Sequence, residues 1–239
     1  MRISLLWVAC CCAVLTACGG SPPTGPTKSP TLSRTRFLAF GDSFTLGEVT
    51  SPIASAGLTK LVVVPTAAYP SVLQGLLSGA YPAQSAAIAI VNAGVAGETV
   101  LEGRDRFAGA LQQARPEVVL LMEGANGLNI AGPDISTDII AEMARTAQAA
   151  GARVFVGSML PQISGRPKAL VPASDLVTYN TRLQAMTRQD GHVFVDVYNP
   201  MLGEVAALIG SDGLHPTEAG YKRIADVFFA AIQANLEVK

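Results

Sequence analysis

The sequence predicts an α/β fold built on a doubly wound parallel sheet. Short, continuous apolar runs alternate along the chain with segments of helical period, and such alternation is typical of parallel strands joined by right-handed crossover helices. The runs are apolar throughout rather than at every second residue, so each strand is expected to be buried on both faces. Residues that directly follow the strands are the first candidates for a site, because ligands of such sheets bind beyond the carboxyl ends of the strands.

Five runs are expected as strands and five segments as helices. The strands cover residues 36–40, 86–91, 117–122, 153–156 and 192–197. The helices cover 69–77, 99–114, 138–150 and 175–187, and a last helix follows Pro216. This last helix carries Ile224, Phe228 and Ile232 on one stripe, which is the spacing of a helix packed on a core. Residues 48–66 fit the alternation less well and are interpreted either as a hairpin inserted near the mouth of the site or as an additional strand.

The composition indicates one compact domain with a large core. Hydrophobic residues make up 49% and charged residues 15% of the 239 residues, which is enough apolar surface for a single domain of this length. The net charge of −1 gives no positively charged footprint for nucleic acid, so a nucleic-acid partner is not expected.

The N-terminus has the pattern of a targeting segment rather than of a folded element. Arg2 provides a positive charge and residues 3–16 form an apolar stretch, which is typical of a secretory signal and short for a membrane-spanning helix. The stretch ends in Leu15-Thr16-Ala17-Cys18, which resembles the lipobox of bacterial lipoproteins. This resemblance implies a signal peptide at 1–17, cleavage before Cys18 and attachment of lipid, palmitate included, to that cysteine. The alternative is an ordinary secretory signal that ends in small residues.

The cysteines and the segment after them set the expected organisation of the mature chain. All four are N-terminal, at Cys10, Cys11, Cys12 and Cys18. Only Cys18 remains after the expected cleavage, so neither a disulfide nor a cysteine metal site is expected in the folded domain. Residues 18–35 are rich in Pro, Ser, Thr and Gly and are interpreted as a tether, with the folded domain at 36–239. A lipidated Cys18 would hold the protein at a membrane of the bacterial cell envelope. The absence of Asp after Cys18 favours the outer membrane, by resemblance to lipoprotein sorting in bacteria with two membranes.

Gly41-Asp42-Ser43 directly follows the first predicted strand and supplies a candidate nucleophile, Ser43. A serine at such a break could equally cap a helix or a turn, and the tripeptide alone does not decide between these roles. The G-x-S-x-G elbow of the common α/β-hydrolase pattern does not occur in the chain.

The chain offers only two histidines as a base for this serine, His192 and His215. His215 lies three residues after Asp212, and across the intervening loop the carboxylate could accept a hydrogen bond from Nδ1 of the imidazole. The alternatives are that His215 helps to start the last helix and that Asp212-Gly213 is a plain turn. His192 opens an apolar run and is interpreted as a strand-entry residue.

Two loops after predicted strands offer donors for the oxyanion that develops in acyl transfer. Residues 92–99 carry Gly94 and Gly97, where the missing side chain lets backbone N–H groups approach a ligand. A dinucleotide loop is disfavoured there because Asn92 occupies the first glycine position of that motif. Residues 123–127 carry Asn126, whose side-chain amide could donate to the same oxyanion or stabilise a turn. These residues are expected to gather with Ser43 on one edge of the sheet.

Taken together, Gly41-Asp42-Ser43, Gly97, Asn126 and Asp212-x-x-His215 resemble the four sequence blocks of the SGNH (GDSL) hydrolase family, in family order, from about Arg36 to the C-terminus. The resemblance implies a flavodoxin-like three-layer fold with a five-stranded parallel sheet and helices on both faces. It implies Ser43 as nucleophile, His215 as base and Asp212 as the residue that orients the base. The oxyanion hole would consist of the N–H groups of Ser43 and Gly97 and the side chain of Asn126.

The third block departs from the family pattern Gly-x-Asn-Asp, because Gly127 follows Asn126. Activity is expected to survive, since the replaced acid is not one of the three catalytic residues, but the placement of Asn126 becomes a question for the structure. Glu123, in the same loop, is interpreted either as a carboxylate that supports the site or as a surface or hydrogen-bonded residue at a strand end.

These residues predict a serine esterase that hydrolyses short acyl esters of small molecules, lipids or glycans through an acyl-enzyme on Ser43, without a metal or organic cofactor. The family resemblance also allows a thioesterase or a lysophospholipase, and the predicted tether suggests an O-acetyl esterase of cell-envelope polysaccharide. The alternative from another class is a catalytically inactive, envelope-binding lipoprotein on a hydrolase scaffold.

Overall fold

A five-stranded parallel sheet forms the centre of the computed structural model, which describes residues 29–53 and 58–238. The strand order is β5-β2-β6-β7-β8. The bounds are β2 Arg36–Gly41, β5 Ala89–Gly94, β6 Val118–Met122, β7 Arg153–Gly157 and β8 Val193–Val195. After β2 the chain crosses to β5 on one side and then returns to β6 on the other, which creates the switch point where doubly wound sheets bind ligands. The predicted fold class, sheet size and strand direction are confirmed.

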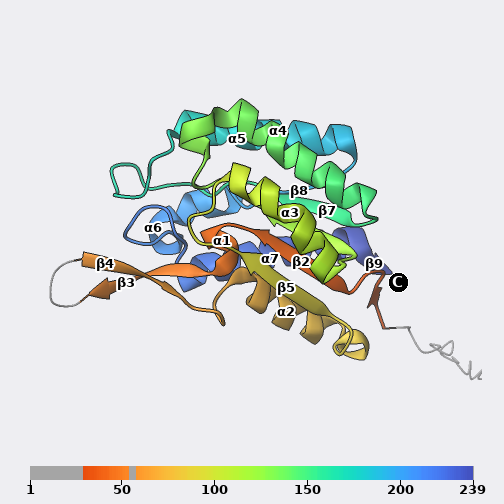
Figure 1. The fold of residues 1–239 in the computed structure, drawn as a ribbon. Coiled ribbons are helices and arrows are strands. Elements are labelled where there is room, and N and C mark those ends of the chain that lie inside the picture. Colours follow the sequence, from red (N-terminus) through yellow and green to blue (C-terminus); the bar gives the residue numbers. More distant parts are fainter. Residues whose placement is uncertain (1–28, 54–57, 239) are drawn as a thin grey trace, which may run out of the picture.

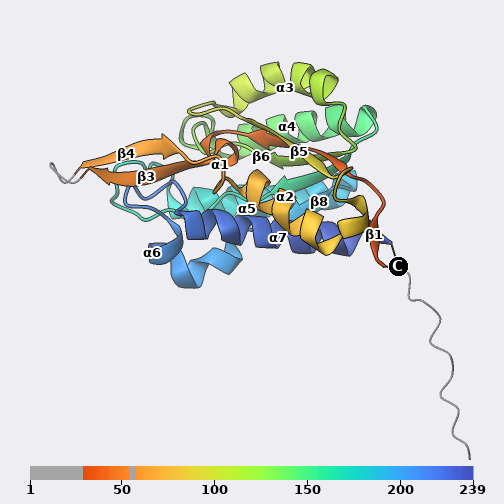
Figure 2. The same cartoon turned by 90° about the horizontal axis from the view of Figure 1, so that it is seen from below.

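Helices cover both faces of the sheet and make a three-layer sandwich (Figures 1 and 2). Three helices lie on one face: α3 Val100–Ala114, α4 Leu128–Ala149 and α5 Ala173–Asp190. The other face is covered by α2 Tyr69–Ala80 and α7 Glu218–Leu236, which pack against each other. The shorter helical elements are α1 Ser43–Leu46, η1 Pro82–Gln84, η2 Asn199–Glu204 and α6 Val205–Leu208.

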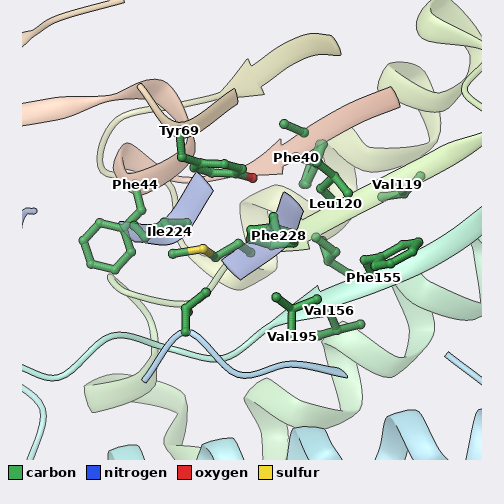
Figure 3. Close-up of a cluster of buried hydrophobic side chains, with 14 of the residues drawn as sticks. Phe40, Phe44, Tyr69, Val119, Leu120, Phe155, Val156, Val195, Ile224 and Phe228 are labelled. Carbon is green, nitrogen blue, oxygen red and sulfur yellow. The ribbon is translucent and has the colours of Figure 1, made fainter. Parts of the chain in front are cut away.

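The core lies on both faces of the sheet. On the side of α2 and α7, large aromatic side chains fill the space (Figure 3). Phe228 of α7 is fully buried, and its ring stacks on that of Tyr69 with the centroids 5.3 Å apart. Phe40 of β2 packs edge-on against Phe107 of α3 on the other face of the sheet. Stacked and edge-to-face aromatic pairs add to the stabilisation that burial itself provides, so the first pair joins α7 to α2 and the second joins α3 to β2.

The edge strand β5 differs from its prediction in position and in burial. It starts at Ala89 instead of residue 86, because η1 and the turn after it occupy residues 82–87. Its neighbour on one side is β2, and no strand among the described residues pairs with its other side. Val91 accordingly remains 47% exposed. A continuous apolar run therefore did not guarantee burial on both faces.

Helix α4 begins ten residues earlier than predicted, at Leu128 instead of residue 138. The first part is separated from the rest by a kink at Gly132, whose φ is 77° and ψ 168°, followed by Pro133. Glycine and proline interrupt the helical pattern, and for this reason the sequence pattern indicated only the segment beyond them.

Residues 48–53 and 58–63 form the two strands of a β-hairpin that projects from the body of the molecule (Figure 1). Strand β3 Glu48–Ile53 pairs antiparallel with β4 Leu58–Val63, and Glu48 lies opposite Val63. The hairpin interpretation is confirmed, and the alternative of an additional strand in the main sheet is wrong.

The folded part of the chain starts before the predicted boundary at Arg36. Strand β1 Thr31–Leu32 pairs antiparallel with β9 Glu237–Val238 at the C-terminus, and Leu32 is 4% exposed. Residues 31–35 thus belong to the domain, although their composition resembles that of a tether. The predicted signal peptide at 1–17, Cys18 and the start of the tether lie outside the described residues. No helix within 29–53 or 58–238 is long and apolar enough to cross a bilayer.

Candidate active site

Ser43 is the first residue of α1 and is placed by the break that ends β2. The residue that caps this helix is Asp42, whose side chain accepts a hydrogen bond from the backbone N–H of Phe44 at 3.0 Å. Because the preceding residue performs the capping, the hydroxyl of Ser43 is available for another partner. The suggestion that Ser43 itself is a cap is therefore wrong.

That partner is His215. Its Nε2 atom lies 3.0 Å from the Oγ atom of Ser43, and its Nδ1 atom lies 2.6 Å from Oδ2 of Asp212. The other carboxylate oxygen of Asp212 accepts hydrogen bonds from the backbone N–H groups of Leu214 and His215, both at 3.0 Å. The structure thus brings an alcohol, an imidazole and a carboxylate into one hydrogen-bonded chain, with the spacing that acyl-transferring triads use.

The loop that carries Asp212 and His215 depends on a glycine between them. Gly213 has a φ of +83°, and a Cβ atom there would lie 2.3 Å from Cβ of Arg166. Only glycine adopts this conformation without strain, and the tight turn is what lets the carboxylate reach back to the ring three residues later. Asp212-Gly213 is therefore a turn and a part of the site at once.

The electrostatics of the loop keep Asp212 ionised. Burial acts to raise its pKa, but the hydrogen bonds from His215 and from the two backbone N–H groups outweigh burial, so the pKa of Asp212 lies below its ordinary value. A carboxylate that stays charged can stabilise the imidazolium that forms when Nε2 takes a proton.

The predicted oxyanion donors lie on the loops that follow β5 and β6. Gly97 has a φ of +74° and borders a small hollow of about 250 Å³. The side-chain Nδ2 of Asn126 donates to the backbone carbonyl of Glu98 at 3.0 Å, which leaves its second N–H free for another acceptor. This bond fixes the Asn126 amide beside the Gly97 loop without the acid that usually follows the asparagine.

Gly94 has a different role from the one that its position suggested. A Cβ atom at Gly94 would lie 2.1 Å from the backbone nitrogen of Leu46. The residue lets α1 pack tightly against the end of β5, and its backbone N–H donates to Oδ1 of Asn92 at 2.9 Å, so this N–H is not available to an oxyanion.

The side chain of Asp42 connects the helix that begins at Ser43 with the loop that carries Asn126. Its second oxygen accepts from the backbone N–H of Ala125 at 2.9 Å, so one fully buried carboxylate holds both the Ser43 helix and the Asn126 loop. Burial is the largest effect on this group and raises its pKa to about 6, although the backbone hydrogen bonds act in the opposite direction.

Comparison with known proteins agrees with this geometry. The family model of the GDSL-like lipase/acylhydrolases matches residues 39–223, which span every residue of the site. The chain belongs to this family. The members of this family are hydrolases, and the relatives of this chain include enzymes that cleave esters. Among curated proteins, the esterase TesA of Pseudomonas aeruginosa is 29% identical to this chain over 139 residues. That match covers 57% of this chain and 66% of the esterase.

Solved structures of similar fold come from several hydrolases. LAE5, an alpha/beta hydrolase enzyme from the metagenome of Lake Arreo, superposes with a TM-score of 0.66 at 20% identity, over 84% of this chain and 96% of that one. An acetylxylan esterase from Geobacillus stearothermophilus gives a TM-score of 0.64 at 20% identity, over 84% and 95%. At such identities the superpositions establish the shared fold.

Within this member of the family, Glu123 is buried rather than exposed. It is 2% exposed, and one of its oxygens accepts from the N–H of Gly124 at 3.1 Å. The other oxygen has no hydrogen-bond partner in the described part of the chain. Burial, together with the nearby charges of Asp42 and Glu98, holds the pKa of Glu123 well above its ordinary value. The surface interpretation of Glu123 is wrong, and the interpretation as a hydrogen-bonded residue at a strand end is confirmed.

Two residues of the site escaped the sequence analysis. Oε2 of Glu48 lies 3.6 Å from Nε2 of His215, and the hydroxyl of Tyr221 donates to the backbone carbonyl of Glu48 at 2.6 Å. For Glu48 the only available signal was its position five residues after Ser43. One turn of helix and Gly47 lie between them and direct the chain back towards the serine. Nothing in the sequence indicated that Tyr221 of α7 meets this segment.

His192 lies away from these residues, at the entry to β8. It is 9% exposed, its N–H donates to the carbonyl of Thr187, and burial lowers its pKa. The strand-entry interpretation is confirmed. In the ranges 29–53 and 58–238 no three His, Cys, Asp or Glu side chains are grouped closely enough to hold a metal ion.

Proposed function

We propose that this member of the family is a serine esterase that cleaves short acyl esters through an acyl-enzyme on Ser43. The observation that carries the proposal is the hydrogen-bonded chain from Ser43 Oγ through His215 to Asp212. The buried and charged carboxylate at its end favours the transfer of the serine proton to Nε2 as the oxygen attacks an ester carbonyl.

The negative charge of the tetrahedral intermediate would be held by the N–H groups of Ser43 and Gly97 and the free N–H of Asn126. No acceptor in the described parts of the chain occupies the backbone N–H of Ser43 or of Gly97, so both are available to the substrate. His215 then returns its proton to the leaving alcohol, and in the second half of the reaction it activates water to release the acid.

A short acyl group is proposed because the domain is of modest size and its sequence contains no obvious large lid, which favours an open site. The hollow of about 250 Å³ that borders Gly97 and the hollow of about 640 Å³ between α3 and β5 do not measure this site, because neither lining includes Ser43, Asp212 or His215. Esters of acetate to butyrate are therefore expected to react faster than esters of long fatty acids.

The test is covalent labelling combined with turnover. The wild-type protein should hydrolyse 4-nitrophenyl acetate and form one fluorophosphonate adduct on Ser43, and the variant Ser43→Ala should do neither. An intact Ser43→Ala variant with normal turnover would contradict the nucleophile. A folded wild-type protein without an adduct would favour the inactive envelope-binding alternative.

We also propose that the protein is attached to the cell envelope through lipid on Cys18. The support is the sequence Leu15-Thr16-Ala17-Cys18 after a charged and apolar leader. When the full chain is expressed in a bacterium, the protein should fractionate with membranes and incorporate labelled palmitate, and Cys18→Ser should abolish both. Palmitate incorporation by the Cys18→Ser variant would contradict the assignment. The same location would place acetylated envelope polysaccharide within reach, and acetate release from such glycans measures that second substrate directly.

A further inference from the structure

Two carboxylates lie beside the ring of His215, one at each nitrogen. Asp212 lies 2.6 Å from Nδ1 and holds the orientation of the ring. Oε2 of Glu48 lies 3.6 Å from Nε2, the same nitrogen that is 3.0 Å from the hydroxyl of Ser43. The proposed mechanism uses the first carboxylate and leaves the second unexplained.

The fold fixes Glu48 at this place. One turn of α1 and Gly47, with a φ of +99°, bring the chain from Ser43 back to Glu48. The hydroxyl of Tyr221 then donates to the backbone carbonyl of Glu48 at 2.6 Å and lies 3.4 Å from that of Ser43. The Glu48 side chain is only 15% exposed, so its charge is less screened by water than that of a surface residue.

The chemistry of the reaction relates this carboxylate to the alcohol part of the ester. To receive its proton, the leaving oxygen must come within about 3 Å of Nε2. Since Oε2 is 3.6 Å from the same nitrogen, adding the two separations places the leaving oxygen within about 7 Å of the Glu48 carboxylate, whatever direction the alcohol takes. Every leaving alcohol therefore passes through the field of this negative charge.

We propose that Glu48 is a specificity residue for the alcohol part of the substrate, and that it favours esters whose alcohol carries a positive charge close to the ester oxygen. The proposal rests on the esterase function proposed above. The carboxylate attracts such a group in the transition state, repels an anionic group, and is indifferent to a neutral group of the same shape.

Cations near the site do not cancel this effect. Arg166 and Lys168 belong to the segment that contacts the Asp212 loop, and both side chains are exposed. Water and salt screen exposed charges strongly, whereas Glu48 is largely buried beside the reacting nitrogen. The charge that water screens less, that of Glu48, dominates at the position of the leaving oxygen.

The experiment compares three acetates that share the acyl group and differ in the charge of the alcohol. These are acetylcholine, its neutral isostere 3,3-dimethylbutyl acetate, and anionic 3-sulfopropyl acetate. The measured quantity is the ratio of kcat/KM for the cationic ester to that for the neutral ester, in the wild type and in Glu48→Gln. For an ammonium nitrogen about 7 Å from the Glu48 carboxylate, the largest separation that the leaving oxygen itself can have, Coulomb's law with an effective dielectric constant between about 80 and 20 predicts that this ratio falls about 3- to 60-fold in the variant.

The ratio separates specificity from general damage to the site, because any loss common to all esters cancels. The ratio of anionic to neutral ester should rise in Glu48→Gln. In the control Glu142→Gln, which removes one exposed charge from α4, both ratios should remain those of the wild type. If Glu48→Gln hydrolyses all three esters with the same ratios as the wild type, the specificity role of Glu48 is overturned and the esterase function still stands. A wild-type protein that hydrolyses none of them would instead contradict the esterase function, and the inference would fail with it.

Discussion

Replacing Asp212 by asparagine tests the orientation of the base with little change in shape. Oδ1 of Asp212 accepts two backbone hydrogen bonds, from Leu214 and His215, and an asparagine oxygen can take them over, so the loop should survive. The amide nitrogen then replaces Oδ2, which lies 2.6 Å from Nδ1 of His215. Two donors would face each other there, and the ring must move its proton to Nε2 to avoid this conflict.

A protonated Nε2 in the neutral ring cannot accept the proton of Ser43. The corresponding change in Ser-His-Asp proteases lowers kcat by about 10⁴-fold, which is about 5.5 kcal/mol of transition-state stabilisation, and the same loss is expected here. The assay is steady-state hydrolysis of 4-nitrophenyl acetate, with thermal unfolding followed by circular dichroism to verify the fold. The control is Asp226→Asn, which removes an exposed carboxylate of α7 paired with Lys222 and should keep kcat within twofold or so. A folded Asp212→Asn protein with kcat within about tenfold of the wild type would refute the orienting role.

Three further predictions follow from single contacts. Asn126→Ala removes one proposed oxyanion donor and should lower kcat about 10²–10³-fold. Steady-state kinetics measures this, and an unchanged kcat would exclude Asn126 from the oxyanion hole. Glu123→Gln tests the buried carboxyl. The pKa of Glu123 is raised in the folded state, so the protonated carboxyl favours the folded protein. This contribution to the free energy of unfolding is fully present below the ordinary pKa of 4.5 and is lost as the pH rises through the raised pKa. Urea unfolding between about pH 5 and about pH 9 should therefore show a smaller loss of stability for the variant than for the wild type, and equal losses would mean that Glu123 ionises normally. Phe228→Ala removes a fully buried ring stacked on Tyr69 and should lower the free energy of unfolding by about 3–5 kcal/mol. A loss below about 1 kcal/mol would show that the core collapses around the missing ring.

The fold was largely predictable because the apolar runs and helical periods lie in the sequence itself. Errors arose where local pattern and tertiary position diverge. Residues 86–88 are apolar but lie in the turn before β5, and Val91 is apolar but half exposed on an edge strand that pairs on one side only within the described residues. Leu32 sits in a stretch with the composition of a tether, yet it is buried against the C-terminus through β9. For Val91 and Leu32, burial is decided by strand pairing with segments that are distant along the chain.

The local motifs of the site were accessible for the same reason, since His215 is the third residue after Asp212 and Gly41-Asp42-Ser43 lies at the end of a strand. Gly97 and Asn126 became candidates through glycine-rich loops and the family resemblance. The dual role of Asp42 was not accessible, because its second partner, Ala125, is 83 residues away. The same holds for Tyr221, whose hydroxyl meets Glu48 across 173 residues.

The amino-acid sequence alone determined the class of fold, the candidate nucleophile and base, and the loops that carry hydrogen-bond donors, because short-range pattern and residue chemistry suffice for these. Only the tertiary structure decided that Oγ of Ser43 lies 3.0 Å from Nε2 of His215, although the two residues are 172 positions apart. It also decided that the carboxylate of Glu48 lies beside the same Nε2 atom. A hydrogen bond requires its two atoms within a few tenths of an ångström of one separation. Over so long a stretch of chain, that precision comes from the packing of β2, α1 and the loop before α7 around a common core.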